Sequence, residues 1–274
     1  CIVPYTRGPR KSRSTQSVLD ECRDWVARGA GDITLLGQNV NVFGKDKYGD
    51  GTSFPELLRK VAAIPGLRRL RFVSAHPRDF SPETIEMFAE LPQLMPRLHL
   101  PLQSGSDSML KKMGRGYNME RFLGVVEGLR KARPDIYLNT TVGTWASPFW
   151  FSIADSVWRG NWDHDFCGEG TARQQWITFR DAMIYAHNVK ISPLCPINSL
   201  MTHGVIYNKG ARGLTTPEGN DLADEIWSGL GLGTQMQELY ITPAMMQPHE
   251  WDTLAAAAKW TRANAATMVD SHWV

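Results

Sequence analysis

Residues 33–41 read Ile33-Thr34-Leu35-Leu36-Gly37-Gln38-Asn39-Val40-Asn41, a short apolar run that ends in polar residues. Similar apolar runs follow at Leu70–Val73, Leu98–Leu102 and Ile136–Leu138. Between the runs, apolar residues recur with the spacing of amphipathic helices, at residues 18–26, 57–62 and 122–129. Ser81-Pro82-Glu83 adds a helix start, with a capping hydroxyl followed by proline. Short strands that alternate with helices predict parallel βα units, and hence a barrel or a doubly wound sheet.

Charge and tryptophan content differ between the two halves of the chain. Of the 30 Lys and Arg residues 22 precede Val142, whereas nine of the ten Trp residues follow it. With the acidic residues included, the first part carries a net charge of about +7 and the second about −5. A basic surface suits a polyanion such as nucleic acid, and a Trp-rich acidic surface suits ring-shaped neutral ligands such as sugars. The sequence therefore predicts two unlike pieces with different partners.

The cysteines and the hydropathy narrow the class of protein. Cys1, Cys22, Cys167 and Cys195 form no CxxC pair, which argues against a disulfide scaffold and favours a reducing compartment. No apolar run reaches 18 residues, so we expect no membrane span and do not count a membrane among the partners. In the second half, helices are predicted over residues 171–189 and 248–269 and strands over 204–207 and 239–241. The junction at residues 133–142 falls inside a predicted strand.

Several motifs of the first half resemble those of the radical SAM tRNA methylthiotransferases. In chain order they are Cys1-Ile2-Val3-Pro4-Tyr5-Thr6-Arg7-Gly8, Leu35-Leu36-Gly37-Gln38-Asn39-Val40-Asn41, Ser74-Ala75-His76-Pro77-Arg78-Asp79-Phe80, Leu98-His99-Leu100-Pro101-Leu102-Gln103-Ser104-Gly105-Ser106-Asp107 and Met113-Gly114-Arg115-Gly116-Tyr117. The second motif looks like the branch that modifies an isopentenylated adenosine beside the tRNA anticodon. The resemblance implies tRNA as a partner and a [4Fe–4S] cluster with S-adenosylmethionine as cofactors.

The resemblance also implies roles for particular residues. Cys1 aligns with the third cysteine of a CxxxCxxC loop, so it is a remnant of the cluster's ligand set, and we expect the chain as it stands not to hold a cluster. Gln38 and Asn39, and likewise Gln103 and Ser104, fall at the strand ends where the family binds its cofactor. The alternative for each polar residue at a strand end is a turn or a helix cap. His99 and His76 lack metal spacing, and His99 reads as a hydrogen-bonded strand histidine.

A basic run opens the chain and could contact phosphates. Its members are Arg7, Arg10, Lys11 and Arg13, joined further on by Arg68, Arg69 and Arg71. Contact with RNA phosphates is one interpretation, because the resembling family acts on RNA. A solvated charged surface is the other, and the sequence does not separate them.

The motifs of the second half resemble a different family, the α-galactosidase-related glycoside hydrolases, which include gut-bacterial proteins labelled as enterotoxins. The resemblance rests on Asn139–Trp150, Ala154–Gly160, Arg173–Asp181, Pro196–Gly204, Leu239–Pro243 and Asp270–Val274. It implies a carbohydrate partner, no cofactor and a catalytic acid/base soon after Trp158. Asp163 is the first candidate and Asp165 the second, with Asp155 as a structural or hydroxyl-binding residue.

Two further features bear on sugar chemistry. Retaining glycosidases need two carboxyl groups about 5–5.5 Å apart, and the upstream Lys-x-Asp strand that supplies the family's nucleophile is absent here. Five tryptophans could stack on sugar rings: Trp145, Trp150, Trp158, Trp162 and Trp176. For any one of them, packing in the core is the alternative interpretation.

Both resembling families use a β/α barrel with its site at the C-terminal rim of the strands. We therefore expect an α/β fold built as a βα-repeat, TIM-like barrel composed of two partial barrels, residues 1–135 and 136–274. The function hypotheses are an RNA-modifying radical enzyme segment, a retaining glycoside hydrolase of α-galactosidase type, and a recombined chain without activity. We expect the first half to be cytoplasmic, while a secreted parent stays open for the second.

Overall fold

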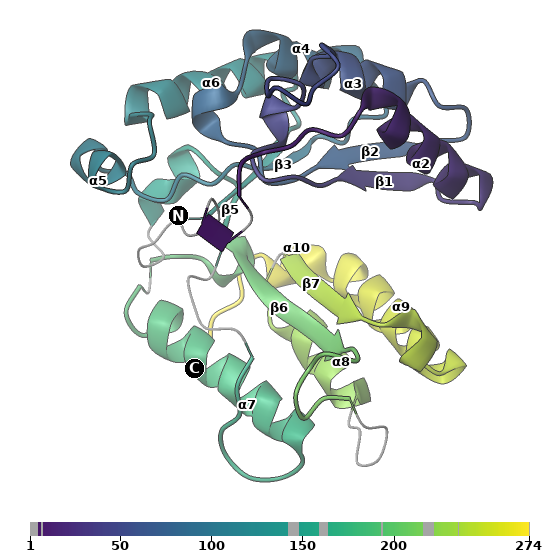
Figure 1. Cartoon of the computed structure of the whole chain (residues 1–274). Coiled ribbons are helices and arrows are strands. Elements are labelled where there is room, and N and C mark those ends of the chain that lie inside the picture. The colour runs from purple at the N-terminus through teal and green to yellow at the C-terminus, as the bar shows by residue number, and fades with distance from the viewer. Residues whose placement is uncertain are drawn as a thin grey trace. The chain divides into compact units, whose positions relative to one another are not determined.

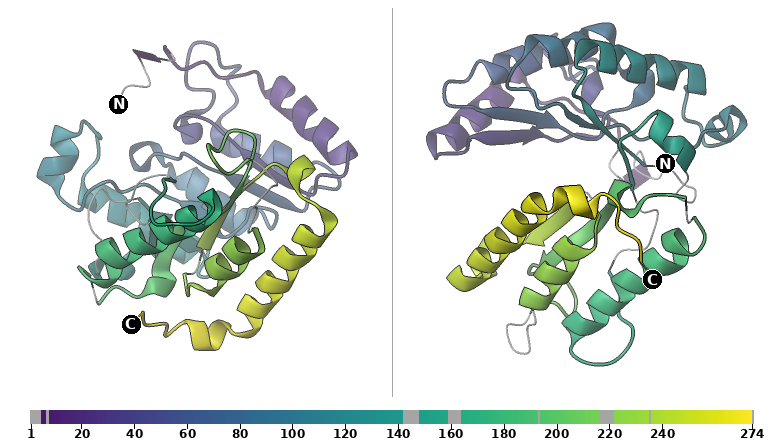
Figure 2. Two further views of the ribbon diagram at one scale, coloured as in Figure 1. Left: turned by 90° about the horizontal axis from the view of Figure 1, so that it is seen from below. Right: turned by 180° about the vertical axis from the view of Figure 1, so that it is seen from behind.

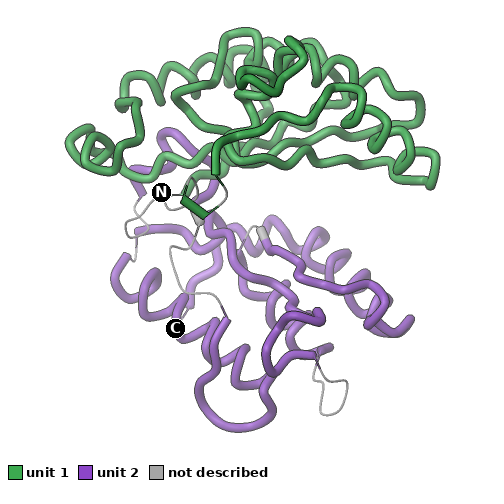
Figure 3. Tube along the Cα trace, viewed as in Figure 1, with its two compact units in different colours: residues 1–141 green, residues 142–274 purple. Residues whose placement is uncertain are grey.

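The chain forms two compact units, residues 1–141 (unit 1) and residues 142–274 (unit 2), as Figure 3 shows. The computed structural model describes residues 5–6, 8–141, 148–158, 164–192, 194–215, 222–234 and 236–273. The two units divide directly after a strand, Tyr137–Thr140, which pairs within unit 1. Among the described residues, no helix is both long enough and apolar enough to cross a bilayer.

Unit 1 is a mixed α/β fold in which parallel strands curl into half of a barrel (Figure 1). Its strands are β1 (Asp32–Leu35), β2 (Arg69–Phe72), β3 (Arg97–His99) and β4 (Tyr137–Thr140). Ile33 of β1 lies opposite Leu70 of β2, and Leu98 of β3 lies opposite Leu138 of β4. The chain before β3 continues the ladder, because Leu70 bridges Leu94. The predicted parallel βα order is thus confirmed for this unit.

The helices of unit 1 begin where capping residues allow them to. They are α2 (Thr15–Ala27), α3 (Phe54–Ala62), α4 (Pro82–Glu90), α5 (Asp107–Lys112) and α6 (Met119–Ala132), with 3₁₀ turns at Val40–Val42 and Pro77–Asp79. Ser53 and Glu56 form a reciprocal capping box at the start of α3. Ser81 caps α4 as predicted, with Pro82 in the first turn. Helices α3, α4 and α6 lie along one face of the strands (Figure 1).

The core of unit 1 is an aromatic cluster between the strands and α3 and α4. The ring of Phe72 on β2 meets the edge of Phe54 at 5.1 Å and lies 5.8 Å from Phe88. All three rings are buried. The apolar faces predicted for α3 and α6 are buried, so the helical spacing correctly identified them. On α2 the predicted face is only partly right: Leu19 and Cys22 are buried, but Trp25 is 51% exposed.

Unit 2 also consists of parallel strands joined by helices. Its strands are β5 (Ser156–Trp158), β6 (Leu200–Tyr207) and β7 (Met236–Ile241). Its helices are α7 (Ala172–Ile184, followed by a π-helical turn Tyr185–Val189), α8 (Leu222–Gly231), α9 (Pro248–Ala263) and α10 (Ala265–Met268). Short 3₁₀ turns lie at Pro148–Ser152, Ile197–Ser199 and Pro243–Met245. All eight residues of β6 are buried, as in the central strand of a parallel sheet. Helices α8 and α9 lie side by side across β6 and β7 (Figure 2).

Candidate functional site

Three strand ends of unit 1 share an unusual backbone conformation. Asn39, Ser74 and Gln103 have φ angles of 55°, 64° and 72°, and they are the non-glycine residues with positive φ in the described part of the chain. They follow β1, β2 and β3 within four residues of each strand's end. A side chain clashes with the backbone in this conformation, so it is uncommon outside glycine and gathers at functional sites. The C-terminal rim of these parallel strands is therefore the candidate site.

Asn39 is held on the rim by an ionic network. Its Nδ2 donates to Asp79 Oδ2 at 2.6 Å, and Arg78 Nη2 donates to the same oxygen at 2.8 Å. Burial opposes ionisation of Asp79, but the hydrogen bonds from Arg78 and Asn39 outweigh it and lower the pKa of this carboxyl. Asn39 Oδ1 is buried, and no residue in the described structure donates to it. The rim thus presents an acceptor suited to a ligand's N–H or O–H group.

The second rim loop is locked to the first by the side chain of Asn41. Asn41 Oδ1 accepts from His76 N at 2.8 Å, and Asn41 Nδ2 donates to His76 O at 3.1 Å. The imidazole lies edge-on to Tyr117 with ring centroids 5.4 Å apart. Burial, followed by the positive charges of Arg115 and Arg78, lowers the pKa of His76 to about 4. His76 is therefore neutral at physiological pH, and its Nδ1 accepts from the Arg78 amide at 3.3 Å.

The third rim loop follows β3 and is fixed by β4. Gln103 N donates to Thr141 O at 2.8 Å, and Leu102 N donates to Thr140 Oγ1 at 3.1 Å. The buried Ser104 hydroxyl accepts from Ser106 N at 3.2 Å, which fits the turn interpretation of this residue. His99 Nε2 lies 2.7 Å from Thr141 Oγ1, so the prediction of a hydrogen-bonded strand histidine is confirmed.

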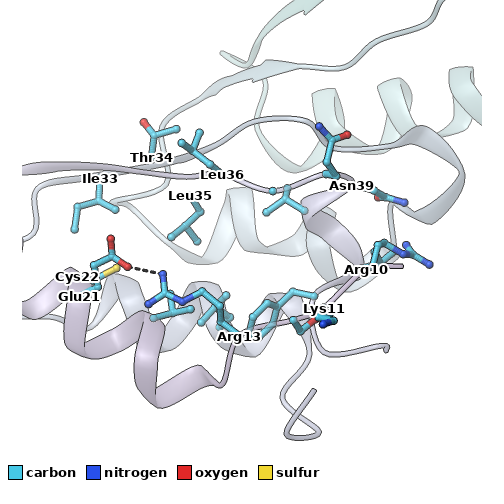
Figure 4. A pocket seen from close by; sticks show the side chains of 18 of the residues that line it. Arg10, Lys11, Arg13, Glu21, Cys22, Ile33, Thr34, Leu35, Leu36 and Asn39 are labelled. Atoms are coloured by element: carbon cyan, nitrogen blue, oxygen red, sulfur yellow. Dashed lines mark hydrogen bonds and ion pairs between the residues drawn. The ribbon is translucent and has the colours of Figure 1, made fainter. Parts of the chain in front are cut away.

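A pocket of about 1070 Å³ runs along β1 to the rim. Figure 4 shows the side chains that line it: Ile33 and Leu35 come from β1, and Asn39 from the rim loop. Residues 8–13 and α2 form another part of the wall, which Val42, Phe43, Asp46 and Leu57 also line. Its volume is slightly above the range of about 300–1,000 Å³ that is usual for small-molecule sites. The structure thus brings the predicted cofactor residues, Gln38 and Asn39, to the same pocket as the predicted basic residues.

Those basic residues are Arg10, Lys11 and Arg13. Arg13 forms an ion pair with Glu21 of α2, whereas Arg10 and Lys11 are exposed at the pocket (Figure 4). Arg7 lies outside the described residues, as does Cys1. Gln103 and Ser104 lie on the rim but do not line this pocket.

The described residues do not provide ligands for an iron–sulfur cluster. No group of three His, Cys, Asp or Glu side chains in the described part of the chain is placed to hold a metal ion. Cys22 lines the pocket, but burial, followed by the charge of Glu21, raises its pKa and keeps it a thiol. Burial raises the pKa of Cys195 as well. Neither cysteine belongs to a group of side chains that is placed to hold a metal ion in the described part of the chain.

Of the carboxylates predicted for sugar chemistry, the structure describes Asp155 and Asp165. Asp163, the first candidate, lies outside the described residues. Asp155 is half-buried just before β5. Asp165 is exposed and lines a hollow of about 590 Å³ together with His164 and Arg212. No second carboxylate is found among the described residues that line this hollow.

The tryptophans predicted to stack on sugars do not form one described face. Trp145 and Trp162 lie outside the described residues, and only the backbone of Trp158 is described, within β5. Trp150 is half-buried against the core around Val157. Trp176 has no exposed surface, so it offers no ring face to a sugar and belongs to the core. For Trp176 the core-packing alternative therefore holds.

Trp176 is part of a buried ionic network that sequence reasoning missed. Its Nε1 donates to Glu225 Oε1 at 3.0 Å, and Ile206 N donates to the same oxygen at 2.8 Å. Glu225 is fully buried and forms an ion pair with Arg173, which is 3% exposed. The partners come from α7, β6 and α8. Nothing in the local sequence signals this pair, because its members are distant along the chain.

Comparison with known proteins identifies the class to which the chain belongs. The model of the radical SAM superfamily matches residues 1–145, which is more than half of the chain. The chain therefore belongs to the radical SAM superfamily.

The similar curated proteins share one name. The tRNA-2-methylthio-N(6)-dimethylallyladenosine synthase of Nitratidesulfovibrio vulgaris (strain DP4) is 63% identical over 142 residues, which are 52% of this chain and 32% of that protein. The enzyme of the same name from Oleidesulfovibrio alaskensis is 60% identical over 140 residues, or 51% of this chain and 30% of that protein. The chain spans about a third of the length of these relatives. The methylthiotransferase resemblance of the first half is confirmed.

The similar solved structures include a glycoside hydrolase. It is the GH36 α-galactosidase AgaA from Geobacillus stearothermophilus in complex with 1-deoxygalactonojirimycin, with a TM-score of 0.51 and 10% sequence identity. The likeness covers 94% of this chain and 40% of that one. At this level of identity the likeness concerns the fold alone.

Proposed function

We propose that unit 1 is the cofactor-binding part of a radical SAM tRNA methylthiotransferase, which adds a methylthio group to an isopentenylated adenosine beside the anticodon. The observation that carries the proposal is the pocket along β1, where Asn39 offers a buried acceptor to which no described residue donates and Arg10 and Lys11 supply positive charge. The similarity to tRNA-2-methylthio-N(6)-dimethylallyladenosine synthases supports it. Such a role would place the protein with its tRNA substrate in the cytoplasm.

The rim residues suit S-adenosylmethionine. The described residues, by contrast, provide no set of ligands for the iron–sulfur cluster. Asn39 Oδ1, for which the described structure shows no donor, suits a donor such as the cofactor's ammonium group, and Gln38 offers a further amide in the same pocket. Bound S-adenosylmethionine would supply a sulfonium whose reductive cleavage starts radical chemistry. Arg78 and Asp79 would hold the Asn39 amide in place, and the neutral His76 would add no charge to the rim.

A pair of matched variants tests the cofactor site. Asn39→Gly keeps the positive φ without strain and removes the amide, whereas Ser74→Gly makes the same backbone change at the next strand end, where the side chain is exposed. A hydrogen bond to a charged group is worth about 1.5–3 kcal/mol, so Asn39→Gly should weaken S-adenosylmethionine binding about tenfold or more in calorimetry. Ser74→Gly should bind as the wild type does. Equal binding by all three proteins, or none by the wild type, contradicts the proposed site.

For unit 2 we propose descent from part of a glycosidase barrel, with carbohydrate binding but without hydrolysis. The fold likeness to an α-galactosidase favours the descent. Glycoside hydrolysis needs two carboxyl groups across the bond, and Asp165 is the lone carboxylate among the described residues of its hollow. The alternatives are a working retaining glycosidase and a recombined chain in which neither unit is active.

A further inference from the structure

A group of positive side chains surrounds an exposed aromatic ring in unit 1. The ammonium nitrogens of Lys11 and Lys47 lie 5.3 Å and 5.1 Å from the centroid of the Tyr48 ring. Tyr48 is 44% exposed, and both lysines are exposed. Arg10 and Lys45, next to them in the chain, are exposed as well. We call Lys11, Lys47 and Tyr48 the lysine–tyrosine platform.

The loop that carries the platform is tied down at two points by carboxylates. Asp46 accepts hydrogen bonds from the backbone N–H and the hydroxyl of Ser12. Asp50 accepts from Thr15 N at 2.6 Å and from its hydroxyl at 3.0 Å. The backbone N–H groups of Thr15 and Thr52 lower the pKa of Asp50 to about 2, so this anchor stays ionised at neutral pH. Lys11 is therefore held beside Tyr48 although 37 residues separate them.

Glycine makes the loop compact enough for this arrangement. Gly44 has φ +77°, and a Cβ there would collide with the carbonyl oxygen of Thr52. Gly44 N in turn donates to the Ser12 hydroxyl at 3.0 Å. The platform is thus pre-organised, and a ligand would meet it without first ordering the loop.

The platform adjoins the candidate cofactor pocket. Lys11 and Asn39 both line that pocket, as Figure 4 shows. Asp46 and Gln38 line it as well. The acidic anchors Asp46 and Asp50 offset only part of the positive charge of Arg10, Lys11, Lys45 and Lys47. A polyanion that reached the pocket from this side would pass the platform.

We propose that the lysine–tyrosine platform is a contact surface for the single-stranded part of an RNA substrate. The lysine ammoniums would bind phosphates and the Tyr48 ring would stack on a base, since unpaired nucleotides are bound by aromatic faces within basic surfaces. This inference rests on the proposed function of unit 1, because it supplies the surface by which the substrate would approach the pocket. A base-paired RNA duplex presents no unstacked base to an exposed aromatic ring, so the platform favours the unpaired nucleotides of an RNA loop.

Fluorescence anisotropy with a labelled anticodon stem–loop RNA and the full 274-residue chain tests the proposal. Tyr48→Ala should weaken binding about tenfold through the loss of stacking, whereas Tyr48→Phe should bind as the wild type does. The slope of log affinity against log salt is negative, and the double variant Lys11→Ala with Lys47→Ala should make it shallower by about 1.4, the value for two single-stranded phosphates. The matched control is Lys60→Ala with Lys131→Ala, which removes the same charge from exposed lysines of α3 and α6.

The outcomes separate the platform from the function on which it rests. A wild-type chain that binds no RNA overturns both. If the wild type binds, but the platform variants bind as tightly as the control, the platform is overturned while the proposed function stands. If the control loses as much affinity as the platform variant, net charge alone explains binding and the platform is again overturned. Circular dichroism of each variant confirms that its fold is intact.

Discussion

Replacing Glu225 by glutamine should destabilise unit 2 by about 3 kcal/mol, because it leaves a buried guanidinium without its counter-charge. The amide oxygen of the new side chain could still accept from Trp176 and Ile206, so the substitution mainly removes the negative charge that faces Arg173. Breaking a buried ion pair from one side costs about 3–5 kcal/mol. Arg173 also donates to Ile206 O at 3.1 Å, which places the expected loss at the lower end.

Urea unfolding followed by tryptophan fluorescence measures this loss selectively. Nine of the ten tryptophans follow Val142, so the fluorescence reports mainly on unit 2. With an m-value of about 2 kcal/mol/M, a loss of about 3 kcal/mol lowers the urea midpoint by about 1.5 M. The double variant Arg173→Met with Glu225→Gln should recover much of the stability, because it leaves no unpaired charge. A midpoint shift below about 0.5 M, or no recovery in the double variant, would refute the reasoning.

Three further predictions concern pH, metal and sugar. Burial lowers the pKa of His76 from 6.5 to about 4, so the unfolded chain takes up this proton at a higher pH than the folded protein does. The stability of the protein is therefore unaffected by this group above pH 6.5 and falls as the pH drops from 6.5 towards 4. Thermal unfolding of His76→Gln should show less acid sensitivity over that window. Anaerobic reconstitution of the 274-residue chain should yield no [4Fe–4S] cluster, and about four irons per chain would contradict this. Hydrolysis of an aryl α-galactoside should be undetectable, whereas turnover that disappears in Asp163→Asn would mean that a second carboxylate completes the site.

The elements that the sequence predicted are those whose apolar pattern is local. Helices α3 and α6 carry uninterrupted faces at helical spacing, and all of the predicted face residues are buried. Helix α8 was missed because Gly229 and Gly231 weaken its helical pattern. Strand β5 was missed because its three residues begin with the polar Ser156 and form no apolar run. Strand β6 is longer than predicted because Thr202 and His203 interrupt its apolar run although both are buried.

The candidate site was predictable only in part, for a different reason. The resemblance identified Gln38 and Asn39, which line the pocket. The positive φ of Asn39 and the orphaned state of its Oδ1 depend on where β2 and Asp79 lie, and residue types do not encode such positions. The same holds for the loop containing Asp46 and Asp50, which reads as an ordinary polar turn. Its contacts with Ser12 and Thr15 join segments more than 30 residues apart.

The positive φ angles of the three rim residues indicate a ligand-binding role that neither the sequence motifs nor the fold indicates by itself. Glycine adopts positive φ at no steric cost, whereas a side chain costs roughly 1–2 kcal/mol there, somewhat less for asparagine. If Asn39, Ser74 and Gln103 only turned the chain after each strand, glycine would do so more cheaply. At Asn39 the side chain supplies what glycine lacks: an amide whose nitrogen donates to Asp79 and whose oxygen has no donor in the described structure. Backbone strain at the rim and a spare acceptor in the pocket thus point to the same ligand-binding role.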